Sequence, residues 1–201
     1  MAKNPYARPD RFTRQARDEG YAARSVFKLK EIDQRFRLLA AGQRVLDLGN
    51  APGSWSKFAI ERVGRRGVVV GVDLTEVRIP GGTWLTRSVF EVGADELLTV
   101  LGGPADVVLS DMAPLTTGDA LGDHVAQLEL ASCAANLAAS LLAPGGSFVV
   151  KVFDGEDAPG FVTGLRGDYE TVKRVRPEAV RQVSREFFVV AKGLVPRSPR
   201  A

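Results

Sequence analysis

Apolar residues along the chain follow two spacings, one typical of helices and one typical of buried strands. Between Val26 and Leu39 they recur every three or four positions, which predicts a helix over 25–40 with Ser25 as its N-cap. Short unbroken apolar runs instead predict buried strands. Such runs lie at 44–48, 67–73, 105–111 and 147–153.

Less regular segments fill the gaps between these elements. They predict helices over 53–63, 91–101, 123–142 and 156–165, and strands near 84–86, 169–175 and 185–195. Strands that alternate with helices predict a doubly wound α/β domain, in which a largely parallel sheet is covered on both faces. Ligands of such sheets bind beyond the carboxyl ends of the strands, so functional side chains are expected there.

Four charged residues lie in apolar or small-residue segments: Lys28, Asp111, Lys151 and Glu186. A buried charge without a partner costs several kcal/mol, so a fold keeps such residues when they pair or act chemically. Asp111 and Lys151 come at the ends of predicted strands and are expected in one crevice. Glu186 can reach that crevice only if its strand lies beside the strand of Lys151, and spacing alone leaves the position of Lys28 open.

A glycine-rich turn follows the first predicted strand, in the segment LDLGNAPGSW. Gly49 and Gly53 permit a tight turn and a close backbone approach to a ligand. Asp73 ends the next strand, where a carboxylate can accept hydrogen bonds from the two hydroxyls of a ribose. The spacing of these glycines differs from the three-glycine pattern of dinucleotide-binding proteins. This difference favours an adenosine-type ligand without a pyrophosphate. Trp55 either offers an apolar surface to that ligand or packs its helix on the sheet.

Composition limits what such a site can belong to. With 201 residues, of which 45% are hydrophobic, the chain is expected to form one domain with a sizeable core. Cys133 is the one cysteine, so no internal disulfide forms. No run approaches the roughly 18 apolar residues of a membrane span. The N-terminus lacks the apolar stretch of a signal peptide, so a cytoplasmic protein is expected.

Charge is distributed unevenly along the chain. Residues 1–30 and 166–201 each carry a net charge of +5, whereas 31–165 carry −7. Basic ends around an acidic centre favour contact with a polyanion such as a nucleic acid, although basic termini can also simply be solvated. Four arginines recur every three residues near the N-terminus and are expected to contact phosphates together with Arg24. They are Arg8, Arg11, Arg14 and Arg17.

Five segments between Arg17 and Gly193 carry a resemblance to a known family: GYAARSVFKLKEID, VLDLGNAPGSWS, VVLSDMAP, LAPGGSFVVKVF and SREFFVVAKG. In these segments the chain resembles the RNA ribose 2′-O-methyltransferases of the FtsJ/RrmJ type. The resemblance implies a class I methyltransferase fold with an antiparallel strand near the C-terminus, and S-adenosylmethionine as methyl donor. It further implies a uridine of 23S rRNA in the large ribosomal subunit as substrate. A basic arm over 1–20, one methyltransferase domain over 21–195, a tail over 196–201 and a monomer are expected.

The resemblance also assigns roles to individual residues. Lys28, Asp111, Lys151 and Glu186 fall on the family's catalytic tetrad. Gly53, Trp55, Asp73 and Asp111 fall on cofactor-binding positions, and Ser88 stands where the family usually has an acid that contacts the adenine amino group. Serine gives up a charge-assisted hydrogen bond there. The adenine contact is therefore expected to be made by Ser88, to be made by a neighbouring backbone group, or to be weaker than usual.

Transfer to a ribose hydroxyl requires that its proton be accepted as the C–O bond forms. Lys151 is the candidate base, which requires its neutral form; burial and Lys28 favour that form, whereas Asp111 and Glu186 favour the cation. The alternative is that Lys151 stays charged and stabilises the developing alkoxide. Sequence does not decide between these two roles, and the base is favoured on family resemblance.

Other functions and sites are less favoured. A tRNA anticodon-loop enzyme would share the tetrad, a weakly catalytic ribosome assembly factor would not need it, and a small-molecule methyltransferase would leave the basic ends unexplained. His124, the single histidine, is expected on the surface, in a loop or at a helix start near the active crevice. No second histidine or cysteine accompanies it, so no metal site is expected.

Overall fold

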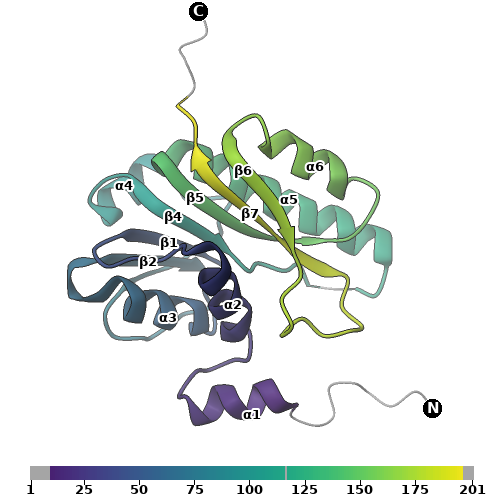
Figure 1. Cartoon of the computed structure of the whole chain (residues 1–201), viewed down its shortest axis with the longest axis horizontal. Helices are drawn as coiled ribbons and strands as arrows, with labels where there is room; N and C mark the ends of the chain where they lie inside the picture. Colours follow the sequence, from purple (N-terminus) through teal and green to yellow (C-terminus); the bar gives the residue numbers. More distant parts are fainter. Residues whose placement is uncertain (1–9, 116, 197–201) are drawn as a thin grey trace, which may run out of the picture.

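The computed structural model describes residues 10–115 and 117–196, which form a seven-stranded sheet in the order β3-β2-β1-β4-β5-β7-β6 (Figure 1). The strands are β1 (Arg44–Leu48), β2 (Val68–Asp73), β3 (Thr83–Thr86), β4 (Ala105–Ser110), β5 (Leu142–Phe153), β6 (Tyr169–Val175) and β7 (Glu186–Leu194). Strands β1 to β5 pair in parallel, and β7 runs antiparallel to both of its neighbours. The predicted α/β class, the mostly parallel sheet and the antiparallel C-terminal strand are confirmed.

Helices cover both faces of this sheet. They are α1 (Arg11–Asp18), α2 (Val26–Phe36), α3 (Ser54–Val63), α4 (Ala94–Leu101), α5 (Ala120–Leu141) and α6 (Ala158–Leu165), with a 3₁₀ turn at Gly64–Arg66. Apolar residues of α2 and α3 pack on one face, and those of α4, α5 and α6 pack on the other. Helix α1 precedes α2 in the chain and lies apart from the sheet, beyond α2 (Figure 1).

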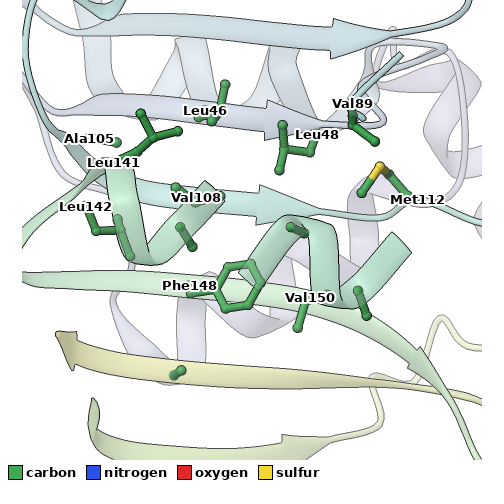
Figure 2. Packing of buried hydrophobic residues seen from close by; sticks show 14 of the residues in the cluster. Leu46, Leu48, Val89, Ala105, Val108, Met112, Leu141, Leu142, Phe148 and Val150 are labelled. Atoms are coloured by element: carbon green, nitrogen blue, oxygen red, sulfur yellow. The ribbon is translucent and has the colours of Figure 1, made fainter. Parts of the chain in front are cut away.

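The core is split by the sheet because successive strand residues point to opposite faces. Leu46 and Leu48 of β1 pack toward α4 and α5 with Val108, Phe148 and Val150 (Figure 2), whereas intervening residues of the same strands pack toward α2 and α3. Both faces of β1, β4 and β5 are therefore apolar, which explains the unbroken apolar runs in the sequence.

Several predicted boundaries are wrong by a few residues, for local reasons. The helix predicted to reach residue 40 ends at Phe36, because Arg37 adopts a left-handed conformation and Asp33 accepts hydrogen bonds from the amides of Leu38 and Leu39. Helix α5 starts at Ala120, because the Asp119 side chain caps it. Ser25 is the N-cap of α2 as predicted, yet its side chain makes no capping hydrogen bond.

The pairing of β5 with β7 determines which of their side chains lie at the carboxyl edge of the parallel strands. Strand β5 starts at Leu142, five residues earlier than predicted, with a register shift where it joins β4. Its antiparallel partner β7 places Glu186 opposite Phe153, two residues after Lys151. The first residue of β7 therefore lies at the carboxyl edge of the parallel strands.

Candidate active site

The structure brings the four predicted charges into one cluster. Lys28 Nζ lies 2.6 Å from Glu186 Oε1 and 3.8 Å from Asp111 Oδ1. Lys151 Nζ lies 3.2 Å from the same Asp111 oxygen and donates a hydrogen bond of 2.6 Å to the Asp111 carbonyl. The four side chains are between 7% and 16% exposed. Two lysines and two acids thus balance their charges where solvent screening is weak.

Neighbouring groups hold this cluster in place. The Lys28 ammonium lies 5.5 Å from the centre of the Phe188 ring, which is fully buried under it. Gln127 of α5 donates a 2.8 Å hydrogen bond to the Lys151 carbonyl. Arg176 donates to the carbonyls of Ser184 and Glu186, at 2.7 and 3.0 Å. These bonds fix the backbone that carries two of the four charges.

A pocket of about 380 Å³ lies beside the cluster, at the ends of β1, β2, β3 and β4. Four of the predicted cofactor residues line it: Gly49, Asp73, Ser88 and Asp111. The Asp73 carboxylate accepts hydrogen bonds from the Ala51 and Thr75 amides, at 2.9 and 2.8 Å. A carboxylate has about four acceptor positions, so this side chain can still bind a ligand hydroxyl.

Glycine is required at two positions of this loop. Gly49 has φ 76°, and a Cβ built there would lie 2.4 Å from Met112 Cγ. Gly53 has φ 97° and precedes α3, and a Cβ there would lie 2.0 Å from Ile79 Cδ1. A side chain at Gly49 would collide with Met112 in the pocket wall, whereas one at Gly53 would collide with Ile79. Gly53 itself is not among the residues that line the pocket.

Trp55 lies in the core rather than in the pocket. Its side chain is buried among apolar residues of the α2–α3 face, with its ring 5.6 Å from that of Phe188. The indole Nε1 donates a 2.8 Å hydrogen bond to the Ser25 carbonyl at the start of α2. Of the two roles open from sequence, the structure gives this side chain the packing role. It joins α3 to the helix that carries Lys28.

Asp47 is a buried acid that sequence analysis passed over. It lies inside β1 and accepts a 2.6 Å hydrogen bond from Ser56 Oγ. Burial raises the pKa of Asp47 to about 7; the Ser56 hydrogen bond opposes this shift, and the negative charges of Asp111 and Asp73 add to it. The signal was present in the sequence, as an acid within the apolar run VLDL.

His124 corrects another expectation. It lies on α5 and is 4% exposed, so it is buried rather than on the surface. Gly155 packs directly over the imidazole, which explains how a polar ring near a helix start becomes enclosed. Residues 10–115 and 117–196 contain no group of three or more acidic, histidine or cysteine side chains arranged to hold a metal ion.

Comparison with known proteins agrees with this geometry. The family model of the FtsJ-like methyltransferases matches residues 21–194. The chain belongs to this family. The FtsJ-like match spans the tetrad and the pocket together, and the predicted family and enzyme class are confirmed.

Relatives of this FtsJ-like chain carry a consistent name. The ribosomal RNA large subunit methyltransferase E of Sorangium cellulosum is 48% identical, over 94% of this chain and 89% of its own length. The protein of the same name from Anaeromyxobacter sp. is 45% identical, over 100% of this chain and 74% of its own length.

Solved structures extend the likeness to the fold. One named as a ribosomal RNA methyltransferase from Plasmodium falciparum has a TM-score of 0.79 at 26% identity, and covers 88% of this FtsJ-like chain and 100% of its own. A methyltransferase from Streptococcus mutans, solved in complex with S-adenosylhomocysteine, shares the fold with a TM-score of 0.54 at 16% identity, over 82% and 97% of the two chains. No helix in the described part of the chain is both long and apolar enough to cross a membrane.

Proposed function

We propose that this protein transfers a methyl group from S-adenosylmethionine to the 2′-hydroxyl of a ribose in large-subunit ribosomal RNA, with a uridine of 23S rRNA as the expected target. The observation that carries the proposal is the largely buried cluster of Lys28, Asp111, Lys151 and Glu186 beside the 380 Å³ pocket. Asp111 belongs to both, so an acceptor oxygen at Lys151 would lie next to a ligand in the pocket.

The pocket fits the methyl donor. S-adenosylmethionine supplies a methyl group on a positively charged sulfur. Asp73 retains acceptor positions for the ribose hydroxyls of the donor, and Ser88 can accept a hydrogen bond from its adenine amino group. Leu74 and Phe90 also line the pocket and are 76% and 62% exposed. Exposed apolar side chains at a pocket rim favour an aromatic ligand ring between them.

Lys151 is the proposed proton acceptor. This role requires the neutral amine, which has two N–H groups and one lone pair. Its nitrogen contacts two oxygens, both of Asp111, which leaves the lone pair for the proton of the substrate hydroxyl. Glu186 lies at ion-pair distance from Lys28, so Asp111 is the acid that directly holds Lys151. The C–O bond forms as the C–S bond breaks, and the hydroxyl proton passes to Lys151. Fixed positions of acceptor and donor supply much of the rate acceleration.

The basic N-terminal segment supports an RNA substrate. Arg11, Arg14 and Arg17 are exposed on α1, in line with a helical stripe, and Arg8 lies outside the described residues. Arg24 has a different role from the one expected. Its guanidinium is bound by Asp10 and by the Ala179 carbonyl, and so it ties the start of α1 to the segment before β7.

Salt dependence tests this surface. We expect the double variant Arg14→Gln/Arg17→Gln to reduce the slope of log KM for RNA against log salt by about 0.7–0.9 per lost phosphate contact. Arg65→Gln/Arg66→Gln is the matched control, because both arginines are exposed in the 3₁₀ turn before β2, at the edge opposite the active site. Equal slopes in both variants and the wild type would remove α1 from RNA binding.

The substrate is tested by mapping 2′-O-methylation across total RNA from cells with and without this protein. The proposal expects the loss of one site in large-subunit rRNA. Loss of a tRNA site instead would establish the anticodon-loop alternative, and no change at any ribose would favour an assembly factor. A monomer acting in the cytoplasm, where ribosomes are assembled, completes the proposal. The share of the chain covered by relatives named for ribosomal RNA favours the rRNA outcome.

A further inference from the structure

A second cavity lies at the same edge of the sheet, on the other side of the charged cluster. It has a volume of about 250 Å³ and is formed by the start of α5, the end of β5 and the segment before β7. Its walls include His124, Phe153, Asp154, Val183, Ser184 and Arg185. Pockets for drug-sized molecules have volumes of about 300–1,000 Å³, so this cavity suits a single ring system.

His124 is a buried polar group that lacks a partner in this cavity wall. Neither ring nitrogen has a hydrogen-bond partner among the described residues, and Asp157 Oδ2 lies 3.8 Å from Nε2. A Cβ at position 155 would lie 2.5 Å from Nδ1, so only glycine there leaves room for the ring. A buried polar group without a hydrogen bond is unfavourable. A ligand in the cavity would satisfy it.

The cavity is joined to the catalytic cluster through the backbone. Phe153 pairs with Glu186 across β5 and β7, and the Asp154 amide donates a 2.8 Å hydrogen bond to the Arg185 carbonyl. Gln127, one helical turn after His124, donates to the Lys151 carbonyl. The donor pocket lies at the ends of β1, β2, β3 and β4, whereas this cavity lies at the end of β5 and the start of β7. Lys151 therefore has the donor pocket on one side and the second cavity on the other.

We propose that this cavity binds the base of the nucleotide whose ribose is methylated. The inference rests on the proposed function. When a ribose hydroxyl is held at Lys151, the base of the same nucleotide lies within the length of one nucleoside from Lys151. Phe153 and Val183 offer apolar contact to the faces of a base, and Val183 is 66% exposed. His124, Ser184 and Arg185 offer hydrogen-bonding groups to its edge.

The charges of the cavity favour a neutral base over a phosphate. Asp123 and Asp154 both line it. Asp123 accepts hydrogen bonds from Thr117 and Gly118, and Asp154 pairs with Arg174 at 2.9 Å. With Arg185 as the one cation among the described lining residues, two carboxylates leave the cavity wall with a net negative charge, which disfavours a phosphate. A pyrimidine base presents both donors and acceptors and carries no charge.

The experiment compares two transcripts of the substrate rRNA segment, one intact and one lacking the base at the methylated nucleotide. We expect removal of the base to lower kcat/KM of the wild type by roughly 10-fold. In His124→Ala and Val183→Glu, kcat/KM for the intact transcript should fall roughly 3- to 10-fold. The ratio of kcat/KM between the intact and the base-free transcript should then approach one. S-adenosylmethionine affinity should change less than twofold in both variants.

Val195→Glu is the matched control, because Val195 is 44% exposed and follows the opposite end of β7. The inference is overturned if the effect of base removal is the same in Val183→Glu as in Val195→Glu and the wild type. Val183 is exposed, so its substitution keeps the test valid even if His124→Ala fails to fold. Absence of ribose methylation by the wild type would overturn the proposed function itself, which is a separate outcome.

Discussion

The donor pocket and the charged cluster lie side by side but are built in different ways. The pocket is formed largely by turns that follow β1, β2 and β3, where Gly49 and Asp73 act through loop conformation and backbone hydrogen bonds. The cluster is formed by side chains from α2, β5 and β7 and from the end of β4, which meet only in the folded chain. The pocket therefore depends on local turns, whereas the cluster depends on how distant elements pack.

Lys151→Arg tests the cluster most directly and has the largest expected effect. Arginine keeps the positive charge but cannot become neutral at ordinary pH, so the proposed base is lost. We expect kcat to fall by about 100-fold or more, with S-adenosylmethionine affinity within about threefold of the wild type. Single-turnover methylation and calorimetry measure the two quantities.

Lys173→Arg is the control, because Lys173 is exposed on β6. If Lys151→Arg keeps a tenth or more of the wild-type rate, Lys151 acts as a cation and the proposed base role is wrong. A parallel loss of donor affinity would instead show that the two regions are not separate.

Asp47 lies within β1, and its pKa depends on the charge of Asp111 in the cluster and of Asp73 in the pocket. Its pKa of about 7 in the folded protein exceeds the value of roughly 3.9 in an unfolded chain, so the folded state binds the extra proton. The unfolding free energy should therefore fall as pH rises from about 4 to about 7, by on the order of 4 kcal/mol, and stay at the lower value above.

Asp47→Asn should remove this contribution. Urea unfolding at several pH values, compared between variant and wild type, measures the difference. The variant is expected to gain stability relative to the wild type as pH rises. A constant difference between the two proteins from about pH 4 to about pH 8 would contradict the raised pKa.

Asp73→Asn tests the donor pocket alone. The substitution keeps the size of the side chain but replaces a charged acceptor by a neutral amide, so donor affinity should fall roughly 10-fold. At saturating donor, kcat should stay within about threefold of the wild type, because the cluster is untouched. Calorimetry and steady-state kinetics distinguish these effects. A loss confined to kcat would place Asp73 in the chemistry instead.

Ser88→Asp has the smallest expected effect, and it should raise the affinity for the donor rather than lower it. An acid at this pocket position restores a charge-assisted hydrogen bond to the adenine amino group. We expect donor affinity, measured by calorimetry, to rise roughly threefold, with no change for a donor analogue whose adenine lacks the amino group. Equal gains for both compounds would mean that the introduced carboxylate acts through general charge rather than through that contact.

What could be predicted from the sequence follows the same division. Lys28, Asp111, Lys151 and Glu186 can be predicted because a charge in an apolar run is conspicuous, and the parallel sheet follows from the alternation of strands and helices. The convergence of Lys28 on the cluster could not be derived from spacing, because it depends on how α2 packs over Phe188.

Other features depend on neighbours that sequence does not reveal. Trp55 has the same residue type whether it faces a ligand or the core, and only the packing against Phe188 and the bond to Ser25 separate the two. His124 is expected on the surface because helix starts usually are exposed, but Gly155 encloses it. His124 and Gly155 are 31 positions apart in the sequence, so the spacing of residues along the chain does not indicate that they are in contact.

Trp55 also gives the protein a built-in optical reporter. The chain has two tryptophans, and Trp84 lies on β3 at the far edge of the sheet. A Trp84→Phe background would leave the fluorescence of Trp55 alone, next to Phe188 and bonded to the start of α2. Its emission would then follow the docking of α2 on β7, and with it the arrival of Lys28 at Glu186, without any attached dye.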